Sequence, residues 1–151
     1  SGRLCSRGFE RLCRVSRAAV LRVVHSGLMD RHPEFLVHLC GSGEWDSAKR
    51  AGELCPQSLT EVGFIHLSTP QQVHLPANRL FPGRTDVLLL HLDPDRLGSP
   101  VLWEPGVVGD PESMVFPHLY GPLPLDAVTG VVRYSADAAG KFPQYRAPPV
   151  P

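Results

Sequence analysis

Gly63–Phe64–Ile65–His66–Leu67–Ser68–Thr69 is the stretch around which the chain is organised. Its composition is typical of a strand, and Pro70 stops it directly afterwards. Successive side chains of an extended segment face opposite ways, so His66 should share one face with Phe64 and Ser68. The residues between them take the other face. The pattern therefore predicts one face anchored in a core and a second face that presents an imidazole and a hydroxyl to a cleft.

Two other histidines occupy comparable settings, since His38 and His118 also interrupt apolar, strand-like runs. For any one of the three, a structural histidine that is hydrogen-bonded at a strand edge is an alternative that stays open. All three lie close to Gly or Pro punctuation, where binding groups collect. Together they favour one shared site over three unrelated ones.

Composition limits the classes of protein to consider. The chain has 151 residues, of which 42% are hydrophobic and 20% charged, which fits one globular domain with a real core. Its net charge is zero, but residues 1–28 carry +5 and the rest −5. The mildly acidic remainder argues against a broad nucleic-acid surface, although local phosphate contacts stay open. No apolar run approaches the ~18–20 residues that a membrane helix needs, so we expect no membrane partner.

The chain divides into three parts: a basic leader over 1–33 that is disordered or targeting, a single globular domain over 34–134, and an Ala/Pro-rich tail over 135–151 that frays. Residues 1–28 resemble a mitochondrial transit peptide, because they are rich in Arg and nearly free of acids. Upstream translation or a processed fragment is the alternative. The four cysteines lack a CxxC pair and indicate reduced thiols. The expected location is cytoplasmic, or mitochondrial if the leader is a transit peptide.

Within 34–134, apolar runs predict short strands at Phe35–Leu39, Phe64–Ser68, Val87–Leu92, Val101–Glu104, Phe116–Tyr120 and Ala127–Tyr134. Apolar residues at helical spacing predict a helix over Glu44–Leu54, and a second over 71–81 that is interrupted at Pro76. The unbroken run Val87–Leu92 predicts a central strand buried on both faces. The expected fold class is therefore α+β, a small mixed, mostly antiparallel sheet with one or two helices.

The candidate catalytic residues are His38, His66 and His118. The candidate substrate-binding residues are Ser68, Thr69, Gln72, Glu104 and Tyr120. No two of the three histidines have the i, i+2 or i, i+4 spacing of chelating pairs, so a zinc site is disfavoured and we expect neither a metal nor another cofactor to be required. Arg79 and Arg84 are candidates for phosphate contacts, although the chain has no glycine-rich phosphate loop.

Several strings resemble, in the same order, the family called domain of unknown function 952. They are GFIHLS at 63–68 with Gln72 behind it, Trp103–Glu104, and FPHLYGPL at 116–123, and the resemblance covers about residues 35–134. That family has no established activity, but its layout is similar to the ADP-ribosyltransferase-like fold. The similarity implies that His38 binds the ribose of NAD, that His66 packs against nicotinamide, and that His118 falls at the place of the late catalytic residue.

The resemblance leaves two functions open. The first is an NAD- or nucleotide-handling transferase or hydrolase of the ADP-ribosyl or phosphoryl transfer class, with NAD as a candidate substrate and RNA or protein as a candidate acceptor. An acid is expected at the third place for ADP-ribosyl transfer, and a histidine there would act as general acid or base instead. The second is a non-catalytic module that binds a nucleotide or ADP-ribose. The sequence does not fix the oligomeric state.

Overall fold

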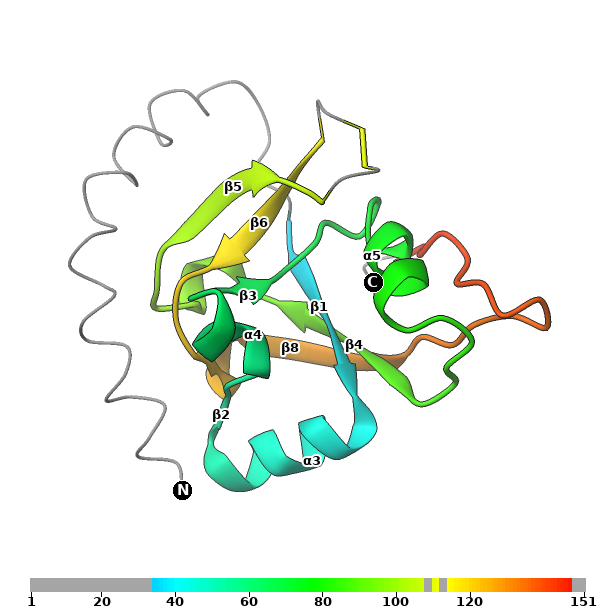
Figure 1. The fold of residues 1–151 in the computed structure, drawn as a ribbon. Coiled ribbons are helices and arrows are strands. Elements are labelled where there is room, and N and C mark those ends of the chain that lie inside the picture. Colours follow the sequence, from blue (N-terminus) through cyan, green and yellow to red (C-terminus); the bar gives the residue numbers. More distant parts are fainter. Residues whose placement is uncertain (1–33, 108–109, 112–113, 148–151) are drawn as a thin grey trace.

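The computed structural model describes residues 34–107, 110–111 and 114–147. The leader predicted over 1–33 lies outside these residues, as does the end of the chain from 148. Figure 1 shows the described part as two small sheets, with helices at their ends and sides.

The two main sheets each have three strands, and all strand pairings among the described residues are antiparallel. The first has the order β1 (Leu36–Gly41), β4 (Val87–Leu92) and β8 (Val128–Arg133). The second has the order β3 (Ile65–His66), β6 (Val115–Leu119) and β5 (Val101–Pro105). A short ladder joins β2 (Glu53–Leu54) to β7 (Leu123–Pro124). The predicted α+β class is confirmed, but the single mixed sheet is corrected to these separate antiparallel sheets.

The first sheet is built around β4, as its sequence predicts. Val87, Leu89, Leu90 and Leu92 are all fully buried, because β4 lies between β1 and β8 and packs on both faces. Leu90 and Leu92 face one apolar cluster, and Val87 and Leu89 face another. This central strand therefore divides the core into two parts.

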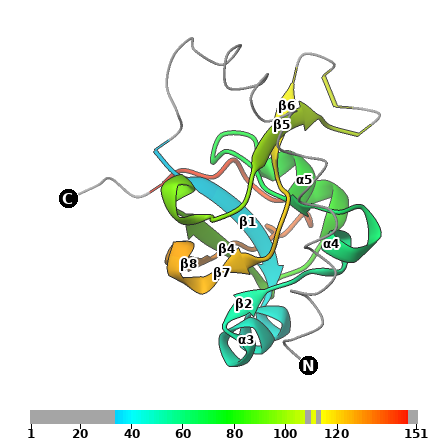
Figure 2. The same cartoon turned by 90° about the vertical axis from the view of Figure 1, so that its left-hand side faces the viewer.

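Helix α3 (Ser42–Ala51) buries Ala48 and lies at one end of the molecule, opposite the β5–β6 hairpin (Figure 2). The prediction extended it to Leu54, which is wrong. Gly52 adopts φ 85° and its N–H bonds to the Ala48 carbonyl, an ending that glycine permits without strain. Leu54 lies in β2 and pairs with Leu123 of β7, so its backbone N–H and C=O groups are satisfied by a sheet and not by the helix.

Helices α4 (Gln57–Glu61) and α5 (His74–Leu80) are shorter. We predicted a helix over 71–81 interrupted at Pro76, but Pro76 lies in the first turn of α5. The N–H groups of the first turn have no intrahelical partner, so proline costs no hydrogen bond there. Two 3₁₀ turns, η1 (Pro94–Arg96) and η2 (Leu125–Ala127), complete the described elements.

The segment after β8 is not frayed as far as the structure describes it. It returns beside α5 (Figure 1), where Phe142 is 3% exposed and packs with Tyr134. Asn78 of α5 donates to the Phe142 carbonyl and accepts from the Phe142 N–H, at 3.2 and 2.7 Å. Within the predicted tail over 135–151, the ring of Phe142 therefore belongs to the core, although most of the residues around it are exposed.

One backbone bridge joins the two main sheets in the described part of the chain. Val37 of β1 and Ser68, just after β3, exchange both backbone hydrogen bonds, each 2.9 Å long. Beyond this bridge the strands diverge, with His38 on one side and His66 on the other. The divergence leaves room for side chains to line a hollow between the sheets.

Two further expectations concern membranes and thiols. No helix among the described residues is long and apolar enough to span a membrane. Cys40 is buried with a free thiol. The expected reduced thiol is therefore present at Cys40.

Candidate functional site

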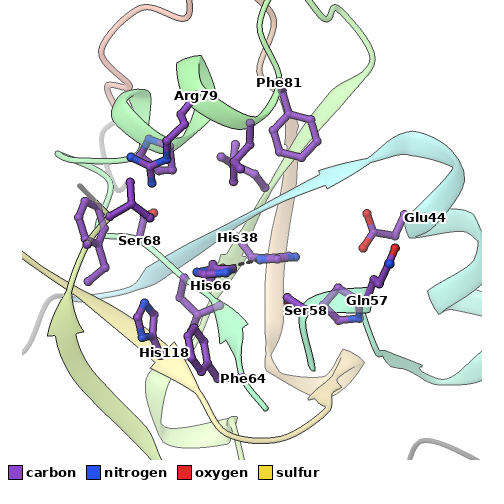
Figure 3. Close-up of a pocket in the computed structure, with 18 of the residues that line it drawn as sticks. His38, Glu44, Gln57, Ser58, Phe64, His66, Ser68, Arg79, Phe81 and His118 are labelled. Atoms are coloured by element: carbon purple, nitrogen blue, oxygen red, sulfur yellow. Dashed lines mark hydrogen bonds between the residues drawn. The ribbon is translucent and has the colours of Figure 1, made fainter. Parts of the chain in front are cut away.

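A pocket of about 700 Å³ opens where the two sheets diverge. It is lined by His38 of β1, His66 of β3 and His118 of β6, and by Ser68 after β3. Figure 3 shows the three imidazoles gathered around its centre. The predicted convergence of the three histidines is present in the structure, whereas their catalytic role stays a prediction.

His38 is held in one tautomer. Its Nδ1 lies 2.8 Å from the backbone carbonyl of His66, which can only accept, so Nδ1 carries the proton. Burial lowers the pKa of His38 to about 4, and the ring is neutral at pH 7. Its Nε2 is buried and finds no hydrogen-bond partner among the described residues. A buried acceptor of this kind is satisfied by a ligand or water that donates an O–H or N–H.

His118 is held by a carboxylate. Its Nδ1 donates to Oε1 of Glu104 at 3.0 Å, and the Tyr120 hydroxyl donates to the same oxygen at 2.6 Å. Burial lowers the pKa of His118, although Glu104 partly opposes the shift. The ring is therefore neutral at pH 7, with Nε2 unprotonated. This is the arrangement of a general base that a neighbouring carboxylate orients.

Phe64 fixes the planes of both rings. It stacks on His118 with centroids 4.1 Å apart and meets His66 edge-on at 5.0 Å. The His66 and His118 rings are themselves 5.3 Å apart. Burial lowers the pKa of His66, and repulsion from Arg79, and from His118 whenever that ring is protonated, lowers it further. The result is a pair of neutral imidazoles held by an aromatic ring.

The remaining predicted residues divide between the pocket and its support. Glu104 and Tyr120 are not lining residues, because they stand behind His118. Gln72 does not line the pocket either. Its side chain accepts from the Thr69 N–H and donates to the Val115 carbonyl, so it ties the turn at 69–72 to β6. The substrate-contact roles predicted for these residues therefore find no support in the position of their side chains.

Sequence reasoning missed several lining residues. Glu44, Gln57 and Ser58 stand at the opposite side of the view from Arg79 and His118 in Figure 3. Partial burial of its carboxyl group raises the pKa of Glu44, although the residue as a whole is exposed. Phe64 is the one further lining residue whose place could be inferred from the sequence, because it shares a strand face with His66. Glu44, Gln57 and Ser58 reach the pocket only through tertiary packing.

Among the residues that the structure describes, no group of three His, Cys, Asp or Glu is arranged to hold a metal ion. Nδ1 of His118 donates a hydrogen bond to Glu104, and Nδ1 of His38 donates one to a backbone carbonyl, so neither Nδ1 atom is available as a metal ligand. That a metal is not required stays a prediction.

Comparison with known families now adds to this geometry. The model of the family described as "Protein of unknown function (DUF952)" matches residues 39–131. The chain belongs to the DUF952 family. The match includes His66, His118 and the Glu104–Tyr120 pair that supports His118, so the histidine pocket lies largely within the DUF952 domain.

The chain is also similar to solved structures. A crystal structure of protein CC0527 from Caulobacter crescentus, a structural genomics target, is 32% identical with a TM-score of 0.63. It covers 72% of this chain and 93% of that one. A solution NMR structure of CC0527 is 33% identical with a TM-score of 0.59, covering 74% of this chain and 92% of that one. No functionally curated protein matches the chain.

Proposed function

We propose that this DUF952 protein is an NAD- or nucleotide-handling transferase or hydrolase of the ADP-ribosyl or phosphoryl transfer class. The observation that carries the proposal is His118, a neutral imidazole oriented by Glu104 that lines a pocket with two other histidines. A base whose pKa lies below the working pH is already unprotonated and ready to accept a proton.

In this mechanism Nε2 of His118 takes the proton of an attacking hydroxyl or water, and the positive charge that forms is stabilised by Glu104 through Nδ1. His66 lies beside it and supplies a hydrogen bond from its neutral ring. The imidazolium of His118 then returns the proton it has taken, to the leaving group or to water. His38 accepts from a donor on the ligand through its unpartnered Nε2, as a ribose hydroxyl would provide. No step requires a metal. The acceptor is a hydroxyl of RNA or protein, or water.

The proposal includes a layout similar to the ADP-ribosyltransferase-like fold. What supports it is the chain order of His38, His66 and His118 on three strands that meet at one pocket. In that layout His38 takes the ribose place, and His66 packs on nicotinamide. Phe64 extends the aromatic surface available for such a ring.

A second candidate is a module that binds a nucleotide or ADP-ribose without turnover. One observation favours it. ADP-ribosyl transfer expects a carboxylate at the third place, but His118 stands there and Glu104 is not a lining residue. Such a pocket would bind and orient a nucleotide without a carboxylate to stabilise the cationic transition state.

The test measures binding and turnover separately on the full chain. A thermal-shift screen with NAD, ADP-ribose, nicotinamide and nucleotides finds the ligand, because binding to the native state raises its stability. Release of nicotinamide from NAD, or of phosphate from a 2′- or 3′-phosphorylated oligoribonucleotide, is then followed by chromatography. His118→Asn keeps a donor near the Nδ1 position for Glu104 and removes the Nε2 base. The enzyme hypothesis expects this variant to bind ligand but to lose at least about a hundredfold in rate.

Glu104→Gln separates orientation from proton transfer. It keeps an oxygen that accepts from Nδ1 but removes the charge that stabilises the imidazolium, so we expect a smaller loss of rate and a shifted pH profile. Binding without turnover in the native chain favours the module instead. A chain that neither binds nor converts any of these compounds would overturn both functions.

A further inference from the structure

Arg79 is the feature of the pocket that the mechanism above does not use. It is the one Lys or Arg among the described residues that line the pocket, and its side chain is 35% exposed. In Figure 3 its guanidinium lies near Ser68 and on the same side of the view as His118. Its charge contributes to lowering the pKa of His66, so it acts on that ring directly.

The guanidinium is already bound to an anion. Nη1 of Arg79 donates to both carboxylate oxygens of Asp110, at 2.9 and 3.1 Å. Asp110 comes from the loop between β5 and β6, and its side chain is only 10% exposed. The same carboxylate also accepts from the backbone N–H of Val107 at 3.2 Å. One carboxylate is thus held by a cation and a backbone donor at the pocket wall.

The space for this carboxylate depends on Gly106. A Cβ at Gly106 would overlap both the Asp110 carboxylate and the Phe116 ring, so only glycine leaves room there. Gly106 and Val107 themselves line the pocket. The anion-holding groups therefore face the same hollow as the three histidines, rather than a separate surface.

We propose that Arg79 and the Val107 N–H form an anion subsite for a phosphate or diphosphate group, and that Asp110 occupies this subsite until the ligand replaces its carboxylate. The planar guanidinium donates to phosphate oxygens as it does to a carboxylate, and backbone N–H groups also bind phosphate. This inference deepens the proposed function and rests on it for the rest of the ligand. A nucleotide diphosphate and free inorganic phosphate share this chemistry, and the experiment separates them.

The arrangement has a consequence for affinity. An entering phosphate competes with a carboxylate that is tethered beside Arg79, so the native chain binds anions more weakly than the subsite itself would allow. Removing the charge of Asp110 should release Arg79. Removing the charge of Arg79 should abolish the subsite.

The experiment titrates the full chain with inorganic pyrophosphate, and separately with ADP-ribose, by isothermal calorimetry. We expect Asp110→Asn to bind pyrophosphate about tenfold more tightly than the native chain, and Arg79→Gln to bind it at least about tenfold more weakly, the loss of a charge-assisted pair. If pyrophosphate shows these changes, the subsite recognises phosphate on its own. If only ADP-ribose shows them, the source is a nucleotide diphosphate. Both results support the subsite.

A matched control exists in the chain. Arg84 makes a comparable two-bond pair with Asp86 at 2.6 and 2.8 Å, but neither residue lines the pocket. Asp86→Asn should leave both affinities unchanged. Arg79→Lys keeps the charge without the planar guanidinium, so its affinity for pyrophosphate should lie between those of the native chain and Arg79→Gln. This variant provides a second test of the subsite if Asp110→Asn lowers the melting temperature too far to be measured.

Equal affinities in native, Asp110→Asn and Arg79→Gln chains would overturn the subsite, as would an equal gain in Asp86→Asn. The outcome is separable from the proposed function, because the titration with pyrophosphate measures binding and the NAD assay measures turnover. If Arg79→Gln leaves NAD conversion unaffected, the enzymatic function is supported and the anion subsite is contradicted. If pyrophosphate binding depends on Arg79 but no compound is turned over, the anion subsite is supported and the enzymatic function is contradicted.

Discussion

The histidines of this pocket are neutral at pH 7, and His38 shows most clearly how a buried neutral imidazole makes the stability of the fold depend on pH. Its Nδ1–H donates to the His66 carbonyl, and burial leaves no favourable place for a second proton. The pKa of about 4 in the folded chain compares with an ordinary value of 6.5. His66 and His118 are shifted in the same direction.

The first prediction is that stability falls as the pH is lowered from about 6.5 towards 4. In that window the unfolded chain binds a proton at His38 that the folded chain does not, so acid favours unfolding. Each pH unit should remove about 1.4 kcal/mol from the free energy of unfolding through His38 alone. Urea titrations at a series of pH values measure this slope.

His38→Asn is the matching variant, because its amide can donate near the Nδ1 position but does not titrate. It should flatten the slope over the same window. Identical slopes in the two proteins would show that His38 is not buried as a neutral ring.

At the level of elements, the closing segment after β8 supports the helix that carries Arg79. Asn78 binds both backbone groups of Phe142, and Tyr134 packs on the Phe142 ring and donates its hydroxyl to the Pro143 carbonyl. One face of α5 is thereby fixed by a segment more than sixty residues away in the sequence. The position of Arg79 at the pocket depends on this support.

The second prediction is that Phe142→Ala costs about 3–5 kcal/mol of unfolding free energy, as expected when a buried aromatic ring is removed from a packed core. Guanidinium denaturation of the full chain measures it. Gln144→Ala, two residues further on and exposed, is the control and should change stability by less than about 0.5 kcal/mol. A loss below about 1 kcal/mol for Phe142→Ala would mean that the segment is not part of the core.

Elements with a strong local signal were predictable, and those that depend on distant partners were not. The run Val87–Leu92 has apolar residues on both faces, which identifies a central strand without knowledge of its neighbours. By contrast, β2 and β7 have two residues each, and only their mutual pairing makes them strands. The packing of Phe142 was missed for the same reason, since Ala and Pro around it dominate the local composition.

For the whole molecule, some parts of the site could be predicted from a local sequence pattern, whereas others depend on residues that are distant in the sequence. Histidines that interrupt apolar strands were visible in the sequence, and three strands bring them together. The pair Glu104–His118 depends on the register of the β5–β6 hairpin, in which Leu102 lies opposite His118 and Glu104 lies two residues further along. The pair Arg79–Asp110 joins a helix to a loop. Neither pair can be read from spacing alone.

The third prediction uses two histidines to separate ligand binding from stability across the molecule. The side chain of His66 is exposed in the pocket, and the bond from His38 goes to its backbone carbonyl, which any residue retains. His66→Ala should therefore abolish ligand binding and leave the melting temperature within a few degrees of native.

His91 is the counterpart, because it lies outside the pocket but inside a packed cluster. Its ring stacks on Phe35 at 4.7 Å and its Nε2 shares a 2.7 Å hydrogen bond with the Tyr145 hydroxyl. With these contacts, His91→Ala should lower the melting temperature while keeping native affinity for the ligand found in the thermal-shift screen. His66→Ala should thus change only ligand binding, which calorimetry measures. His91→Ala should change only stability, which thermal unfolding measures. If His91→Ala lost binding as fully as His66→Ala, the histidine pocket would not be the ligand site, because a change outside it would matter equally.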